Sequence, residues 1–294
     1  MKMKVIMITL SILVTLLLST AGSGSRPAGS VSPSDEEICG KKFALAVSES
    51  LASRPIGEVM VAIGTSFLGT PYVAYVLEEP GPEHLVINLR GLDCVSFVEN
   101  TLTLSRCVKL HRTTFEEFKN QLRLIRYRNG ILDRYPSRLH YFSDWIGNNT
   151  AKGVALNIGK DLGGIPFRKE MSFMSTHRSS YRQLEDENFL REIRNQETTL
   201  DSTERFYIPK EQLASLQGRI HNGDIIGITT SLEGLDIVHT GLAIWQDGVL
   251  KFLHAPLSKG KVQISDKSLV EYLQGYKNQT GVMVARPLEP IPIK

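Results

Sequence analysis

Residues 236–255 read DIVHTGLAIWQDGVLKFLHA, and the predicted sheet is built around this stretch. Two runs rich in β-branched and aromatic residues flank Asp247-Gly248, a dipeptide typical of two-residue hairpin turns. Pairing the two runs across this turn places Gly241 opposite His254. His239 and His254 then lie as diagonal neighbours on one face of a sheet, within reach of two imidazoles. We therefore predict a β-hairpin that presents two histidines side by side.

The rest of the chain predicts helices first and strands last. Short β-branched runs between turn residues predict strands over residues 224–230, 237–245, 249–254, 262–264 and 281–286. Helices are predicted where a capping residue precedes apolar residues at helical spacing. The predicted helices cover residues 35–51 (after Ser34), 55–67, 94–108 (after Asp93), 114–127 and 186–196, and a further helix is predicted to start at Ser137. Consecutive late strands favour an antiparallel sheet packed on the earlier helices, an α+β fold.

Residues 1–21 are predicted to be a secretory signal peptide. A basic start and an apolar run over residues 5–18 end in the small-residue cleavage site Ser19-Thr20-Ala21. The apolar run is short for a membrane span, so membrane contact is expected only if this segment stays uncleaved. Residues 22–34 are rich in Gly, Ser and Pro and predict a flexible lead-in to a single domain over residues 35–294.

Charge and composition exclude few functions. The chain has 294 residues, 41% of them apolar, which is enough for a sizeable core. Without Lys2 and Lys4 the basic residues number 32 against 31 acidic ones. With no long basic run and no groove-reading motif, we expect no nucleic-acid partner.

Three cysteines stand out in an exported chain, where disulfides can form. Cys39 and Cys107 either form a disulfide or remain two buried thiols, and the sequence leaves both open. Cys94 follows a predicted N-cap, so the amides and dipole at the helix start are expected to stabilise its thiolate. A lone cysteine is usually a small buried hydrophobe. A cysteine at a helix start followed by His239 and His254 on strands is instead typical of a cysteine hydrolase.

Five motifs occur in the order found in the NlpC/P60 superfamily of papain-like cell-wall hydrolases, which the chain resembles. They are Gly69-Thr70-Pro71-Tyr72, Asp93-Cys94-Val95-Ser96-Phe97, Gly223-Asp224, His239-Thr240-Gly241-Leu242-Ala243 and Leu253-His254-Ala255. The resemblance implies Cys94 as nucleophile, His239 as base, His254 as the residue that orients the base, and Tyr72 as an oxyanion or substrate contact. It implies a papain-like fold with no cofactor and no metal.

Within that superfamily the chain most resembles the DUF1460 branch, N-acetylmuramoyl-L-alanine amidase-like proteins. The resemblance is carried by residues 138–149 (RLHYFSDWIGNN), residues 157–164 (NIGKDLGG) and the GLDIVH approach to His239. Residues 110–218 form an insertion beyond a compact NlpC/P60 domain, and Val95-Ser96 replaces the common Ser-Gly. The branch implies cleavage of the amide between the lactyl group and L-alanine in small anhydro-muropeptides, in the periplasm. A stem-peptide endopeptidase and a non-catalytic cell-wall binding module are the alternatives.

The insertion is predicted to contact the muropeptide. Arginines suit peptide carboxylates and aromatic rings suit sugars. Arg138, Tyr141 and Trp145 are our candidates, since spacings of three and four place them on one face of the helix predicted from Ser137. His140 and Asp144 have metal-ligand spacing, but no third ligand is evident, so no metal is expected.

Overall fold

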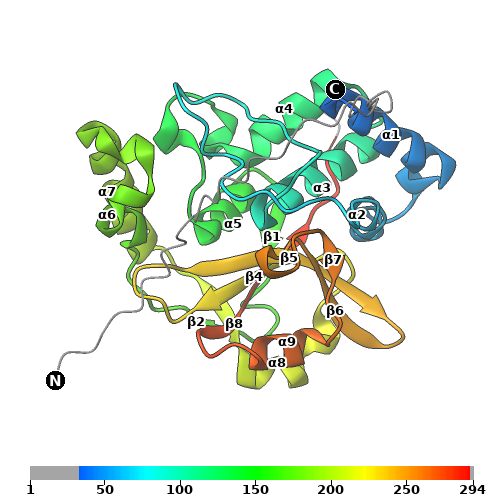
Figure 1. Ribbon diagram of the computed structural model, residues 1–294. Coiled ribbons are helices and arrows are strands. Elements are labelled where there is room, and N and C mark those ends of the chain that lie inside the picture. Colours follow the sequence, from blue (N-terminus) through cyan, green and yellow to red (C-terminus); the bar gives the residue numbers. More distant parts are fainter. Residues whose placement is uncertain (1–32, 292–294) are drawn as a thin grey trace, which may run out of the picture. The chain divides into compact units, whose positions relative to one another are not determined.

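The computed structural model describes residues 33–291, and an antiparallel sheet organises them (Figure 1). The predicted signal peptide and nearly all of the predicted lead-in fall outside the described residues. From Ser34 onward the described chain forms one compact unit. No helix within this part of the chain is both long enough and apolar enough to cross a membrane.

The strands pair in the order β2-β3-β8-β4-β5-β6-β7, and β1 also pairs with β8. Their bounds are β1 Ala155–Asn157, β2 Ile165–Pro166, β3 Phe206–Pro209, β4 Ile225–Thr230, β5 Ile237–Gln246, β6 Val249–His254, β7 Gln263–Ile264 and β8 Gln279–Pro287. The last five of these correspond to the predicted strands, and every pairing is antiparallel. The α+β class is therefore confirmed.

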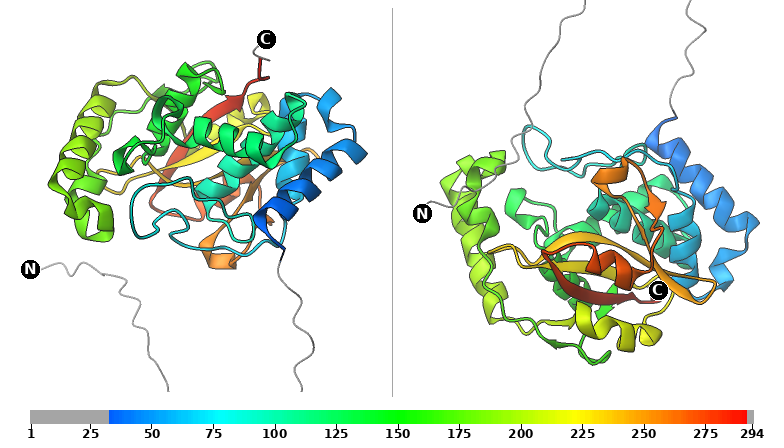
Figure 2. Two further views of the ribbon diagram at one scale, coloured as in Figure 1. Left: turned by 90° about the horizontal axis from the view of Figure 1, so that it is seen from above. Right: turned by 60° about the horizontal axis from the view of Figure 1, so that its bottom comes forward.

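Helices cover both faces of the sheet (Figure 2). Their bounds are α1 Asp35–Ser48, α2 Ile56–Thr65, α3 Cys94–Lys109, α4 Phe115–Arg126, α5 Phe142–Ala151, α6 Phe173–Thr176, α7 Glu187–Ser202, α8 Lys210–Leu216 and α9 Leu269–Gln274. Helices α2 and α3 pack on β5 from one side, whereas α8 and α9 pack on β8 from the other. The sequence predicted only the first of these two layers.

Side-chain caps explain most helix starts. Ser34 forms the predicted capping box, and Asp93, predicted as an N-cap, caps α3 and forms a capping box as well. The prediction of a helix starting at Ser137 is wrong, because Ser137 ends a 3₁₀ turn and α5 begins only at Phe142. Residues 138–141 therefore lie outside the helix.

Each face of the sheet has its own apolar core. Leu242 and Leu253 pack with the helices around α3, whereas Ala243 and Phe252 pack with residues of α8 and α9. All three cysteines are free thiols, and Cys39 and Cys107 are buried in the α3-side core.

Candidate active site

The β5–β6 hairpin brings two imidazoles together. Gly241 pairs with His254, as predicted, and the Nε2 atom of His239 lies 2.7 Å from the Nδ1 atom of His254. A Cβ atom on Gly241 would lie 2.9 Å from the Cβ atom of His254 and 2.6 Å from the Leu253 carbonyl oxygen. Both approaches are too close, so this position requires glycine for the two histidines to meet.

A β-bulge immediately precedes His239. Ile228 of β4 pairs with His239, but the next residue, Thr229, pairs with Ile237, so Val238 is the extra residue. Bulges bend a strand and redirect the side chains that follow. Here the bulge lies beside the predicted base, and no residue pattern around Val238 predicted it.

The two histidines lie on the sheet face that α9 covers. The Phe252 ring packs edge-on against His239, with ring centroids 5.5 Å apart, and the Tyr272 ring of α9 packs edge-on against His254 at 5.3 Å. The body of α3, whose first residue is the predicted nucleophile, packs on the opposite face. Tyr272 was not among the predicted site residues, because no local pattern connects α9 with the hairpin.

Thr240 connects β5 to the start of α3. Its hydroxyl donates a hydrogen bond of 2.9 Å to the carbonyl oxygen of Cys94. This bond attaches the first residue of α3 to the strand residue directly after His239. Strand alternation could have indicated this role, since Thr240 must point away from the face that His239 occupies.

The start of α3 is fixed by its cap. The Asp93 carboxylate accepts from the Ser96 amide at 2.7 Å, and the Ser96 hydroxyl accepts from the Asp93 amide at 2.9 Å. Ser96, which departs from the common superfamily motif, therefore completes the capping box. The first amides of a helix have no partner within it, so the start of α3 can stabilise negative charge beside Cys94.

The thiol and the two imidazoles are uncharged at rest. Burial raises the pKa of the Cys94 thiol to about 12, and the Asp93 carboxylate adds to the rise against hydrogen bonds from Thr240. Burial lowers the pKa of His239 to about 4 and that of His254 to about 3. The expected stabilisation of the thiolate by the helix start is therefore outweighed by burial and Asp93. At neutral pH the groups are a thiol and two uncharged imidazoles.

The short contact between the imidazoles restricts their tautomers. For His239 to accept a proton at Nδ1, its Nε2 atom must already hold a hydrogen and donate it to His254 Nδ1. His254 then carries its own hydrogen on Nε2. That buried atom has no hydrogen-bond partner in the described part of the chain.

Tyr72 lies beside the predicted nucleophile. Its amide donates to the Gly260 carbonyl oxygen at 2.8 Å, and it forms a bridge with Leu92, two residues before Cys94. Burial raises the pKa of the Tyr72 hydroxyl to about 12, and the charges of Cys94 and Asp93 contribute. The hydroxyl is thus protonated at neutral pH and can donate.

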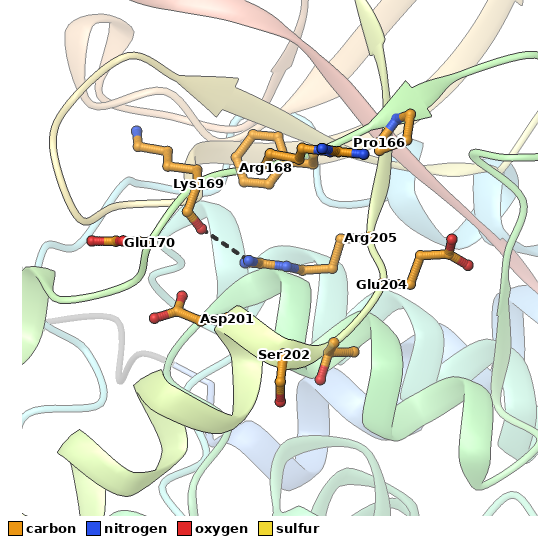
Figure 3. A pocket seen from close by; sticks show the side chains of 10 residues that line it. Pro166, Arg168, Lys169, Glu170, Asp201, Ser202, Glu204 and Arg205 are labelled. Carbon is orange, nitrogen blue, oxygen red and sulfur yellow. Dashed lines mark hydrogen bonds between the residues drawn. The ribbon is translucent and has the colours of Figure 1, made fainter.

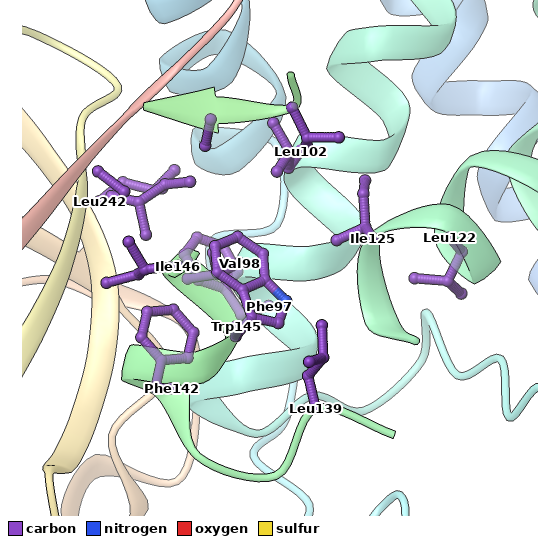
Figure 4. Packing of buried hydrophobic residues seen from close by; sticks show 14 of the residues in the cluster. Phe97, Val98, Leu102, Leu122, Ile125, Leu139, Phe142, Trp145, Ile146 and Leu242 are labelled. Atoms are coloured by element: carbon purple, nitrogen blue, oxygen red, sulfur yellow. The ribbon is translucent and has the colours of Figure 1, made fainter. Parts of the chain in front are cut away.

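The three insertion residues do not form the expected ligand-binding face. Arg138 is buried outside the helix and pairs with Glu78 at 2.7 Å, and the buried Tyr141 hydroxyl donates to Glu197 at 2.7 Å. Figure 4 shows Trp145 of α5 packed against Phe97 and Val98 of α3, and its Nε1 atom donates to Glu99 at 3.2 Å. The prediction of a shared helix face is wrong.

A separate hollow occurs within the insertion. Figure 3 shows its lining, residues 166–170 and 201–205, where the Arg205 guanidinium donates to the Lys169 carbonyl oxygen at 2.9 Å. It shares no residue with the Cys94 and histidine site. Among residues 33–291, no three His, Cys, Asp or Glu side chains cluster in a way that could hold a metal ion.

Comparisons with known proteins identify the family of the chain. A family model described as AmiA-like, N-acetylmuramoyl-L-alanine amidase-like, matches residues 62–282. An N-acetylmuramoyl-L-alanine amidase structure from Bacteroides uniformis is 37% identical, with a TM-score of 0.76 over 79% of this chain and 98% of that chain. A Bacteroides fragilis structure, provisionally called a xylanase, is 37% identical, with a TM-score of 0.72 over 76% and 98%. No curated protein matches.

A more distant structure has the same fold. It is a DUF1460 protein from Legionella pneumophila, 23% identical, with a TM-score of 0.65 over 88% of this chain and 97% of that chain. The predicted resemblance to the DUF1460 branch is confirmed. The family match includes Tyr72, Cys94, His239 and His254. The chain belongs to the N-acetylmuramoyl-L-alanine amidase-like family, whose members hydrolyse amide bonds of peptidoglycan.

Proposed function

We propose that this protein is a cysteine amidase that cleaves the amide between the lactyl group of N-acetylmuramic acid and L-alanine in small muropeptides. The observation that carries the proposal is the 2.7 Å contact between His239 and His254, on a hairpin whose Thr240 bonds to the carbonyl oxygen of Cys94 at the start of α3. It leaves His239 Nδ1 as the ring nitrogen available to the thiol. A nucleophile, a base and a group that orients the base are the three parts that acyl transfer needs.

In the first half-reaction His239 Nδ1 takes the proton of the Cys94 thiol as sulfur attacks the lactyl carbonyl carbon. The carbonyl oxygen becomes an oxyanion, which the amides at the start of α3 and the Tyr72 hydroxyl are placed to stabilise. His239 then returns the proton to the alanine nitrogen. The carbon–nitrogen bond breaks, the peptide leaves with a free amino group, and a thioester remains on Cys94.

In the second half-reaction water replaces the amine. His239 accepts a proton from the water as its oxygen attacks the thioester carbonyl, and then gives that proton to the departing sulfur. The muramic acid leaves with a free carboxyl group. The uncharged imidazole of His239 suits both half-reactions, because it can accept a proton at neutral pH.

One similar structure has the provisional name xylanase, and the activity in that name does not fit the chemistry proposed here. A glycosidase of the usual kind flanks its bond with two carboxylates. The groups gathered here are a thiol and two imidazoles. We also propose export to the periplasm, on the basis of the signal-peptide pattern in residues 1–21.

The test is mass spectrometry of defined muropeptides after incubation with the protein. We expect N-acetylmuramic acid and an intact stem peptide, released from soluble fragments faster than from intact sacculi. A comparison of 1,6-anhydro and reducing sugars gives the sugar preference. Cleavage within the stem peptide would establish the endopeptidase alternative, and binding with no cleavage would establish the binding module.

A further inference from the structure

The His254 imidazole has one ring nitrogen without a hydrogen bond. Its Nδ1 atom lies 2.7 Å from the Nε2 atom of His239, whereas its own Nε2 atom is buried and has no hydrogen-bond partner within residues 33–291. The whole side chain is buried, so solvent does not reach this atom. Because a buried polar atom without a partner costs free energy, we expect a neighbouring group to compensate for it.

Three rings pack around the His254 imidazole. Phe252 covers one face of it, since the ring centroids are 4.6 Å apart and the planes are tilted by only 35°. The His239 ring meets it at the Nδ1 edge. The Tyr272 ring of α9 lies perpendicular to it, with centroids 5.3 Å apart and planes at 90°. Of these three rings, Tyr272 is the one whose role at the site is still open.

Tyr272 lies beside the imidazole and not over its second face. The ring centroids of Tyr272 and Phe252 are only 5.6 Å apart. If these two rings covered opposite faces of His254, their separation would approach the sum of their distances from it, which are 5.3 and 4.6 Å. The Tyr272 ring therefore lies toward the rim of the imidazole. Perpendicular rings at such a distance place the edge of one ring against the face of the other.

Electrostatics indicates that the edge in this contact belongs to His254. The face of an aromatic ring carries partial negative charge and its rim partial positive charge, so a ring face attracts an N–H group. His254 has one ring nitrogen left for this contact, Nε2, because its Nδ1 atom faces His239. An Nε2–H group directed at the Tyr272 face forms an N–H···π contact, a weak hydrogen bond. The buried donor then has an acceptor.

We propose that Tyr272 is a positioning residue for His254, and that the face of its ring accepts the Nε2 hydrogen. The inference rests on the proposed function, since a hydrogen on His254 Nε2 belongs to the tautomer in which His239 Nδ1 can take the thiol proton. When His239 becomes charged, positive charge extends through the shared contact to His254, and the Tyr272 face stabilises it. Tyr272 should therefore affect kcat and leave KM unchanged, because this charge appears only during the reaction.

The kinetic test replaces Tyr272 by leucine and by phenylalanine. Tyr272→Leu should lower kcat about tenfold with unchanged KM, and Tyr272→Phe, which keeps the ring face, should retain the wild-type kcat. Tyr276→Leu is the matched control, because Tyr276 is exposed and packs on Tyr272 at 5.3 Å, and no ring contact joins it to His254 in the described chain. Thermal unfolding checks the fold of each variant, and Tyr272→Met serves if leucine is not tolerated. Normal kcat in folded Tyr272→Leu, or equal losses in the leucine and phenylalanine variants, would overturn the proposal.

The second test needs no turnover and so separates this inference from the proposed function. Nitrogen NMR of Cys94→Ala protein with labelled histidines reports which ring nitrogen of His254 carries the hydrogen, and the His254→Ala variant identifies its signals by their loss. We expect hydrogen on Nε2 in the parent and with Tyr272→Phe, and a mixture of tautomers with Tyr272→Leu. An Nε2 atom without hydrogen in the parent, or an unchanged tautomer with Tyr272→Leu, would overturn the proposal. Cleavage at another bond would refute only the proposed function.

Discussion

Two regions of this protein bury polar side chains, and they use them in opposite ways. In the insertion, buried arginines pair with carboxylates from outside it: Arg126 lies 2.7 Å from Glu99, and Arg138 lies 2.7 Å from Glu78. At the β5–β6 hairpin, His239 and His254 share one contact and leave other ring nitrogens uncommitted. Residue type therefore does not distinguish ligand contacts from structure. Spare hydrogen-bonding capacity alone does not distinguish them either, since Arg205 of the insertion also has two buried nitrogens without a partner.

The sharpest test of the hairpin region is Cys94→Ala. We expect hydrolysis to fall by at least about 10⁴-fold, since removal of a nucleophile eliminates the covalent route. The protein should stay folded, because Cys94 is only half-buried and is held through its backbone. Activity and thermal unfolding should be measured together. The matched control is Cys107→Ala in the α3-side core, which should keep its activity on the folded protein and lose some stability. Comparable turnover by Cys94→Ala would refute the cysteine mechanism.

The second prediction concerns the group that orients the base. His254→Ala should lower kcat by roughly 10²–10⁴-fold with little change in KM, if triad energetics apply here. The reason is that His239 loses the partner that fixes its ring and tautomer. His177→Ala, an exposed histidine of the insertion, is the control and should be neutral. Normal kcat in His254→Ala would reduce His254 to a packing residue.

The third prediction tests the insertion. Trp145→Ala should cost about 3–5 kcal/mol of unfolding free energy, because it empties a fully buried site and removes one of the two side-chain donors to Glu99, the other being Arg126. Urea unfolding measures this loss. At a temperature where the variant remains folded, activity should be equal on substrates with and without sugar. A stable variant that is impaired only on sugar-bearing substrates would restore Trp145 as a ligand contact.

The sequence predicted the hairpin region well because its determinants are local. A turn dipeptide and strand periodicity are enough to set the pairing of Gly241 with His254. The start of α3 was predicted for the same reason, because the cap involves only Asp93 and Ser96, three residues apart. The roles of Cys94, His239 and His254 themselves remain predictions that rest on family resemblance and geometry.

The insertion was predicted poorly because its determinants are distant in sequence. Arg138 was assigned to a ligand, but its partner Glu78 lies 60 residues earlier, in a segment with no recognisable pattern. Strands β1–β3 have two to four residues each and form only by pairing with distant segments. The bulge at Val238 and the contact of Tyr272 with His254 likewise depend on tertiary packing.

The last prediction concerns the charge state of Cys94, where sequence and structure disagree. If the thiol pKa is about 12, alkylation of Cys94 by iodoacetamide should accelerate about tenfold per pH unit from pH 6 to pH 9, without a plateau. Peptide mass spectrometry separates this label from Cys39 and Cys107, which are buried and should react more slowly. A plateau below pH 7 would instead show a preformed thiolate–imidazolium pair, as the helix start alone suggested.

The Asp93→Asn variant tests the same point, because it removes the negative charge of Asp93 while keeping the N-cap of α3. Asparagine caps helices about as well as aspartate, so α3 should keep its start. The Asp93 charge disfavours the thiolate and raises the Cys94 pKa, so its removal should lower that pKa and increase the thiolate fraction at a given pH. Labelling at pH 7 should therefore be faster than in the wild type, by up to about tenfold for each pKa unit. Slower labelling of a folded Asp93→Asn variant would mean that the carboxylate assists the thiol, and would reverse the assignment of Asp93 as the charge opposing ionisation.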